Sequence, residues 1–201
     1  MTVSDSTATL LADRIGQSQV LNATMLNDGK LLEASGQFLN VTTEALLQGR
    51  TLFFFGNGGS AADSVHIAAE FLGRYLVDRR PLPAVSLASN ISALTAIGND
   101  YGFELVFSRQ IEALGKSGDV AVGLTTSGRS RNVQIALESA QGLGMRTVAL
   151  TGADPGPVGD ASELTLSVPS SSTPLIQQAH MQLAHMACEW SEEAVVNADA
   201  S

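Results

Sequence analysis

The stretch that decides the fold is residues 51–60, Thr-Leu-Phe-Phe-Phe-Gly-Asn-Gly-Gly-Ser. Residues 51–55 form a short, continuous apolar run, which is typical of a parallel strand buried on both faces. Residues 56–60 can turn the chain tightly, and a helical pattern follows over 61–75. The loop therefore precedes the first turn of a helix, where free backbone N–H groups bind anions.

The same strand–turn–helix rhythm continues through the rest of the chain. Strands alternating with helices favour one parallel sheet with right-handed crossovers. We therefore predict an α/β protein. Apolar runs predict further strands at 84–87, 120–124, 147–150 and 164–168, and helical patterns lie near 91–97, 101–114, 130–143, 156–161 and 173–196.

Residues 4–49, before the first strand, are predicted to be helical. Apolar residues recur at helical spacing, Asn27-Asp28-Gly29 interrupts the pattern, and an amphipathic segment follows over 31–47. We divide the chain into a helical arm at 1–49 and one structural unit at 50–201. Packing on the domain or on another subunit is the simplest role for the arm, and regulation is the alternative.

Composition excludes several classes of protein. The chain has 201 residues, 44% of them hydrophobic, and a formal net charge of −9, whereas a general nucleic-acid binder needs a basic face. Cys188 is the single cysteine, so no intrachain disulfide forms and a reducing cytoplasm is the expected compartment. Neither a signal peptide nor a membrane span is expected, because no basic patch precedes an apolar core and no apolar run approaches 18 residues.

A second polar loop follows the predicted strand at 120–124. Four hydroxyls lie within six residues of it, on Thr125, Thr126, Ser127 and Ser130. Capping of the next helix by Ser127 or Ser130 would need only one of them. Hydroxyls together with free amides bind phosphate, and both loops follow strands at the end where ligands collect. The first loop is neither a P-loop nor a full dinucleotide fingerprint, so the pair of loops predicts a bound phosphate.

The three histidines of the chain, His66, His180 and His185, fall on two predicted helices. His66 and Glu70 share a helix face at a spacing of four, and Gln177 and His185 share one at a spacing of eight. If those faces meet, two imidazoles, a carboxylate and an amide oxygen could hold zinc tetrahedrally. A structural role is the commoner one for each histidine, and His180 is left outside the metal set.

Several separated motifs then resemble one family. They are Gly56-Asn-Gly-Gly-Ser-Ala-Ala-Asp63, His66-Ile-Ala-Ala-Glu70-Phe-Leu-Gly-Arg74, Leu94-Thr-Ala-Ile-Gly-Asn-Asp100, Thr126-Ser-Gly128 and Ile176-Gln177. In this order, over roughly residues 50–190, they resemble the phosphoheptose isomerases, which are sugar isomerase (SIS) domain proteins. The resemblance implies a three-layer, flavodoxin-like fold with a five-stranded parallel sheet, and a homotetramer with active sites between subunits.

The resemblance also implies an activity and a site. The family interconverts sedoheptulose 7-phosphate and D-glycero-D-manno-heptose 7-phosphate, here through an enediol. Glu70 is expected to be the base, and His185 the acid and base on the oxygens. One zinc ion per subunit is expected on His66, Glu70, Gln177 and His185. The expected substrate-binding residues are Asn57, Gly58, Ser60, Glu70, Arg74, Asn99, Asp100, Thr125, Thr126, Ser127, Ser130 and Gln177.

Some positions depart from the family pattern and leave alternatives open. Pro174 stands where some members carry an aspartate, and Leu175 and Gln178 replace charged residues of the last helix. An isomerase of a different sugar phosphate is therefore one alternative. A non-catalytic SIS protein, resembling a group that associates with a replication initiator, is another. That group lacks the residues matching Glu70 and His185, so their presence favours an enzyme.

Overall fold

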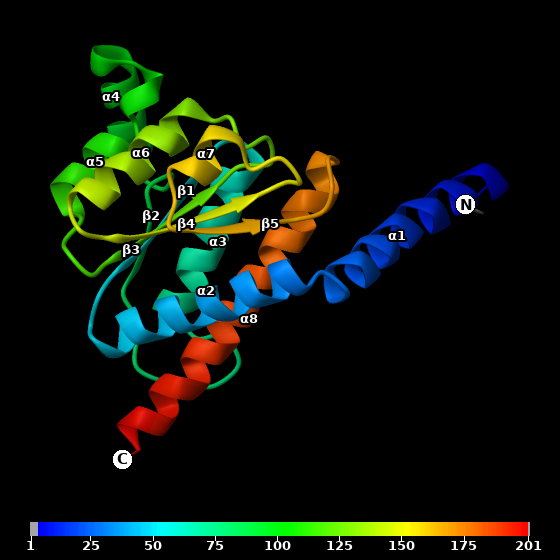
Figure 1. Ribbon diagram of the computed structural model, residues 1–201, viewed down its shortest axis with the longest axis horizontal. Helices are drawn as coiled ribbons and strands as arrows, with labels where there is room; N and C mark the ends of the chain where they lie inside the picture. Colours follow the sequence, from blue (N-terminus) through cyan, green and yellow to red (C-terminus); the bar gives the residue numbers. More distant parts are fainter. Residues whose placement is uncertain (1–3, 201) are drawn as a thin grey trace.

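The computed structural model describes residues 4–200 and contains one five-stranded sheet (Figure 1). All of its strand pairs are parallel, in the order β2-β1-β3-β4-β5. This is the flavodoxin-like strand order, which confirms the predicted fold class. The strands are β1 (Leu52–Gly56), β2 (Ala84–Ser86), β3 (Val120–Leu124), β4 (Arg146–Thr151) and β5 (Leu164–Ser167).

Helices cover both faces of the sheet and complete the three layers (Figure 1). Helices α2, α3 and α8 lie on one face, and α5, α6 and α7 lie on the other. The helices are α1 (Asp5–Leu26), α2 (Gly29–Leu47), α3 (Gly59–Leu72), α4 (Ile91–Tyr101), α5 (Ser108–Leu114), α6 (Arg131–Gly142), α7 (Gly156–Asp160) and α8 (Thr173–Asp199), with a 3₁₀ turn at Phe103–Leu105.

Strand β1 shows why its sequence is apolar at every position. Leu52 and Phe54 face the core beneath α2, α3 and α8, whereas Phe53 and Phe55 face the core beneath α5 and α6. Because side chains alternate between the two faces of a strand, a strand covered on both faces needs a continuous apolar run. All five residues of β1 are buried.

The single helix predicted over 101–114 is wrong. Gly102 adopts φ +97° and ψ 150°, far from helical values, and ends α4. The 3₁₀ turn follows, and α5 begins only at Ser108. None of the residues of α4 is buried, so the helix stands out from the body of the protein.

The two N-terminal helices differ in how they pack. Helix α2 places Phe38 and Leu46 in the same core as α8 and the sheet. Helix α1 projects away from the sheet (Figure 1) and buries only Leu21 and Met25 of its described residues. The division of the chain at residue 49 stays a prediction. Within residues 4–200, no helix has both the length and the apolar character needed to cross a membrane.

Candidate active site

The two polar loops meet at the point where the strand order reverses. Strands β1 and β3 are neighbours, and their last residues, Gly56 and Leu124, are paired in register. Helix α3 leaves β1 toward one face of the sheet, while α6 leaves β3 toward the other. This arrangement opens a crevice at the carboxyl ends of the strands, where ligands bind in such sheets.

A cavity of about 200 Å³ lies between these loops. The Thr125 hydroxyl is 3.0 Å from that of Ser130 and 3.4 Å from that of Ser127. Asn57 exchanges two amide hydrogen bonds with Asn132, at 2.8 and 2.9 Å, and so ties the first loop to α6. The predicted substrate-binding residues that line the cavity are Asn57, Ser60, Thr125, Thr126, Ser127, Ser130 and Gln177.

Three helix N-termini supply residues to this cavity, namely those of α3, α6 and α8. None of the three receives a side-chain cap from the described residues, although Ser130 stands at the cap position of α6. By contrast, Ser4, Asp28 and Asn90 cap α1, α2 and α4. The open N-termini leave backbone N–H groups and positive dipole ends available to an anion.

A cluster of two histidines and a glutamate lies between α3 and α8. The Nε2 atoms of His66 and His185 are 3.3 Å apart, and His66 Nε2 is 3.2 Å from Glu70 Oε1. One ligand atom from each of the three residues lies within 4.8 Å of the others. Imidazole and carboxylate are ligands that zinc accepts, so the donor set and its convergence fit the ion.

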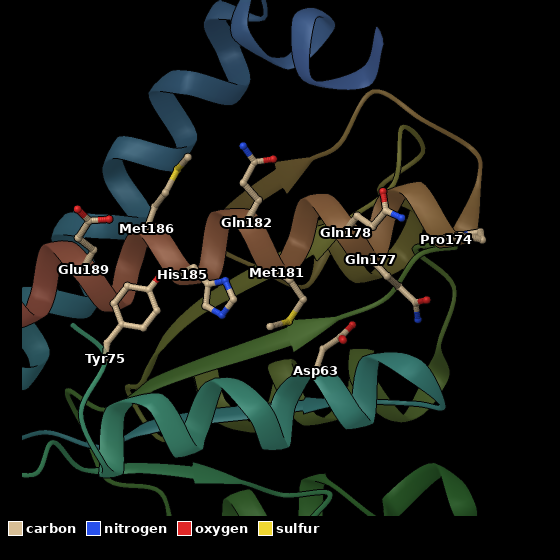
Figure 2. Close-up of a pocket in the computed structure, with 10 residues that line it drawn as sticks. All are labelled: Asp63, Tyr75, Pro174, Gln177, Gln178, Met181, Gln182, His185, Met186 and Glu189. Atoms are coloured by element: carbon tan, nitrogen blue, oxygen red, sulfur yellow. The ribbon is translucent and has the colours of Figure 1, made fainter. Parts of the chain in front are cut away.

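A larger cavity of about 760 Å³ borders this cluster (Figure 2). From α8, Gln177, Met181 and His185 point toward α3 (Figure 2). Burial and the neighbouring His66 lower the pKa of His185, and Glu70 acts in the opposite direction. His185 is therefore held toward its neutral form, which can both accept and donate a proton.

Gln177 lies between the histidine–glutamate cluster and the two polar loops. It lines both cavities, and its amide lies against Gly59, where an added Cβ would collide with it. It precedes His185 by eight residues, which is about 12 Å along a helix. The structure thus joins Gln177 to the two polar loops, while His66, Glu70 and His185 form the compact metal-type cluster.

Asp63 is a site residue that the sequence reasoning missed. It lies on α3, one turn before His66, and points toward α8 in the larger cavity (Figure 2). Its Oδ2 atom is buried and has no hydrogen-bond partner within residues 4–200. Burial raises the pKa of Asp63, and His66 opposes that change. Its position at the start of α3, a turn from His66, was the available signal.

Five predicted substrate contacts line neither cavity: Gly58 in the first loop, Glu70 in the cluster, and Arg74, Asn99 and Asp100. Arg74 is exposed after the end of α3, and Asn99 and Asp100 are exposed on α4, where the Asn99 amide donates to Asp100 at 2.8 Å. Within a single described chain, the structure therefore does not bring these last three to the site.

His180 is buried in the core, away from the cluster. Its Nε2–H donates to the carbonyl oxygen of Thr151 at 3.1 Å, while its Nδ1 atom has no hydrogen-bond partner within the described residues. Burial lowers its pKa to about 4, against a small opposing effect of the Thr151 bond. His180 is therefore neutral at pH 7 and serves packing rather than ligand binding.

A family model places this arrangement among known proteins. The model described as the SIS domain matches residues 17–152. Two curated relatives, both phosphoheptose isomerases, align over most of the chain. The one from Geobacter sulfurreducens is 48% identical over 95% of this chain and 97% of its own. The one from Aquifex aeolicus is 52% identical over 77% of this chain and 81% of its own.

Solved structures agree with the sequence relatives. A phosphoheptose isomerase from Neisseria gonorrhoeae superposes with a TM-score of 0.85 at 38% identity, covering 92% of this chain and 98% of that one. One from Francisella tularensis superposes with a TM-score of 0.88 at 30% identity, covering 96% and 100%.

Proposed function

The chain belongs to the phosphoheptose isomerase family of SIS-domain proteins, and from that premise we propose that it converts sedoheptulose 7-phosphate to D-glycero-D-manno-heptose 7-phosphate. The observation that carries the proposal is the joining of two sites. An anion cavity with three open helix N-termini adjoins a carboxylate–imidazole cluster, and Gln177 lies between the two. The first site suits a phosphate, and the second suits proton transfer.

The chemistry assigns a role to each end of the cluster. Glu70 takes a proton from C1 of the ketose to give an enediol and returns it to C2. His185 moves a proton between the oxygens, because the C2 oxygen gains a hydrogen as the C1 oxygen loses one. Glu70 and His185 reach one reacting centre because each lies beside His66, within the same 4.8 Å cluster.

Zinc is part of the proposal. His66, Glu70 and His185 would hold one ion per subunit, with the Gln177 amide as the fourth group that the resemblance implies. When bound, the ion supplies positive charge that polarises the substrate carbonyl. The chain's own contribution is to direct two imidazole nitrogens and a carboxylate toward one point, as the distances within the cluster show.

The phosphate end is assigned to the loops. Ser60, Thr125, Ser127 and Ser130 offer hydroxyls, and Thr126 also lines the cavity. Gly58, with φ +55° and open space where a Cβ would stand, lets a ligand approach the backbone closely. The hydroxyls of Thr125 and Ser130 already contact each other, so they are held near one position. Asn57 is placed to contact the sugar chain beside its bond to Asn132.

We also propose an assembly and a location. Arg74, Asn99 and Asp100 lie outside the cavities of their own chain, which supports a homotetramer whose active sites lie between subunits and receive these residues from a neighbour. The single cysteine, Cys188, is buried and unpaired, which supports a reducing cytoplasm.

The test is a panel of C5 to C8 ketose phosphates, assayed with and without added zinc after removal of metal by a chelator. We expect conversion of sedoheptulose 7-phosphate and, in D₂O, deuterium at C2 of the product, because the returned proton exchanges with solvent. Conversion of only another ketose phosphate would reassign the substrate. If the protein binds these ketose phosphates but converts none of them, the assignment as an enzyme is wrong and a non-catalytic binding protein is favoured.

A further inference from the structure

The segment after α3 carries an aromatic ring that packs on His185. The Tyr75 and His185 rings are nearly parallel, with an interplanar angle of 23° and centroids 5.4 Å apart (Figure 2). His66 lies against the same imidazole, at a centroid distance of 5.3 Å and an angle of 58°. The His185 ring is therefore restrained by Tyr75 as well as by its partner in the cluster.

Tyr75 belongs to a segment without helix or strand, so its position needs another anchor. Glu192 provides it. The Glu192 carboxylate accepts the backbone N–H groups of Tyr75, Leu76 and Val77 at 2.9, 2.7 and 3.0 Å. Glu192 follows His185 by seven residues on α8 and therefore lies on the same face, two turns further on. One helix thus carries both His185 and the anchor of the ring that packs on it.

Arg79 connects the same anchor to the end of α3. Its guanidinium donates to the carbonyl oxygens of Glu70, Phe71 and Gly73 at 2.9–3.0 Å. Its Nε atom lies 3.2 Å from Glu192 Oε1, in an ion pair with 1% and 3% of the two side chains exposed. The C-terminal end of the helix that carries Glu70 is therefore tied to the helix that carries His185.

The contacts of the Glu192 carboxylate favour its charged form. Burial raises the pKa of Glu192, but the three backbone N–H groups and Arg79 together outweigh burial and lower it. The carboxylate therefore stays charged at neutral pH. Removing one member of a buried pair is strongly destabilising, whereas an intact pair adds little stability by itself. Holding the segment that carries Tyr75 in place would explain why Arg79 and Glu192 form a buried ion pair at this position.

We propose that Tyr75 is a positioning residue for His185 and that the buried Arg79–Glu192 pair sets its place. The proposal adds a residue role to the proposed isomerase function, and its predictions about activity rest on that function. The ring, not the hydroxyl, performs this role, since the contact that joins Tyr75 to His185 is the packing of their rings. The alternative is that the segment contributes to stability alone.

The first test compares Tyr75→Phe and Tyr75→Leu, with the exposed neighbour changed in Leu76→Ala as the control. We expect kcat to fall at least about tenfold in Tyr75→Leu with KM unchanged, because the phosphate loops are untouched while the imidazole loses its restraint. Tyr75→Phe should retain the wild-type kcat, because it keeps the ring. An equal loss of kcat in Tyr75→Phe and Tyr75→Leu, or no loss of kcat in Tyr75→Leu, would overturn the proposal.

The second test needs no turnover. The chain has three histidines, so ¹³C-labelled histidine gives three sets of ring signals, which His66→Gln and His185→Gln assign. The His185 ring protons should keep their shift in Tyr75→Phe and lose the ring-current contribution of the tyrosine in Tyr75→Leu. Glu192→Gln should move the same signals, while the exposed Glu193→Gln should not. Unchanged His185 signals in Tyr75→Leu would reject positioning, whether or not the isomerase assignment stands.

Discussion

At the scale of single residues, two glycines shape the anion cavity. Gly59 leaves room for the Gln177 amide, with which a Cβ would collide. Gly128 adopts φ +66°, and a Cβ there would meet the carbonyl oxygens of Asp154 and Pro155. An L-residue at Gly128 would therefore suffer both backbone strain and a collision with backbone that cannot move freely. The two positions hold the loops close to their neighbours.

Glu70 is the residue on which turnover depends most directly. Glu70→Gln keeps the shape of the side chain but removes the proton acceptor, so we expect kcat to fall by about 100-fold or more. Binding of the sugar phosphate should persist, because the phosphate loops are unchanged. Turnover assays and calorimetry measure the two effects, with the exposed Glu33→Gln as the control. Wild-type turnover in Glu70→Gln would reject Glu70 as the base.

His180 predicts a pH dependence of stability. Its pKa is about 4 in the folded chain against a usual value of 6.5, so the unfolded chain takes up a proton that the native state excludes. Stability from this residue is complete above pH 6.5 and is lost as pH falls toward 4, by about 3 kcal/mol. Urea unfolding between pH 4 and 7 should show a smaller loss in His180→Gln. An equal loss of unfolding free energy between pH 7 and 4 in the wild type and in His180→Gln would contradict this prediction.

At the scale of elements, the helices divide by how their N-termini are satisfied. Helices α1, α2 and α4 have side-chain caps. Within the described chain α3, α6 and α8, which reach the cavity, have none, and neither do the short helices α5 and α7, which do not line it. Capping satisfies orphan N–H groups, so an uncapped end keeps them available. The caps therefore stabilise α1, α2 and α4 at their ends, whereas the N–H groups at the starts of α3, α6 and α8 stay available beside the cavity.

The cap of α2 offers a direct measurement. The Asp28 carboxylate accepts the N–H groups of Lys30 and Leu31, both at 3.1 Å. Asp28→Ala should lower the free energy of unfolding by about 1 kcal/mol, while Asp28→Asn should keep most of it, because asparagine caps nearly as well. Urea denaturation distinguishes them. A loss in Asp28→Asn as large as in Asp28→Ala would show that the charge, not the cap, matters.

At the scale of the whole molecule, α1 presents an apolar surface that the rest of residues 4–200 does not cover. The helix extends beyond the body (Figure 1), and Leu10, Leu11 and Ile15 are 53%, 54% and 63% exposed. Contiguous exposed apolar surface is characteristic of protein–protein contacts. This surface supports the proposed homotetramer, in which a second copy of the chain would cover it.

The assembly can be tested through this surface. Leu11 and Ile15 lie one turn apart, so Leu11→Lys combined with Ile15→Lys places two charges on one face of α1. We expect a smaller particle mass by light scattering and an unchanged circular dichroism spectrum. Ser6→Lys with Thr9→Lys adds the same charge on the opposite face and should leave the mass unchanged. Equal masses for all three proteins would exclude α1 from the interface.

Local pattern was sufficient for most of the fold. The phenylalanine run of β1 predicted a doubly covered strand, and the spacing of His66 and Glu70 predicted their contact. It failed at Gly102, where the chain leaves the helix in a conformation that neighbouring residues do not signal. It also missed Asp63 and the Arg79–Glu192 pair, because burial and partners depend on distant segments.

The sequence by itself determined the strand–loop–helix units, the two polar loops that follow strands and the histidine–glutamate face of α3. These depend on interactions between residues a few positions apart, which composition and spacing express directly. Only the tertiary structure decided that the Nε2 atoms of His66 and His185, which are 119 positions apart in the sequence, lie 3.3 Å from each other. Tertiary packing also put Tyr75 on the His185 imidazole and left Leu10, Leu11 and Ile15 of α1 exposed within residues 4–200. The packing of α8 beside α3 is the physical reason, since no periodicity in either helix specifies its partner.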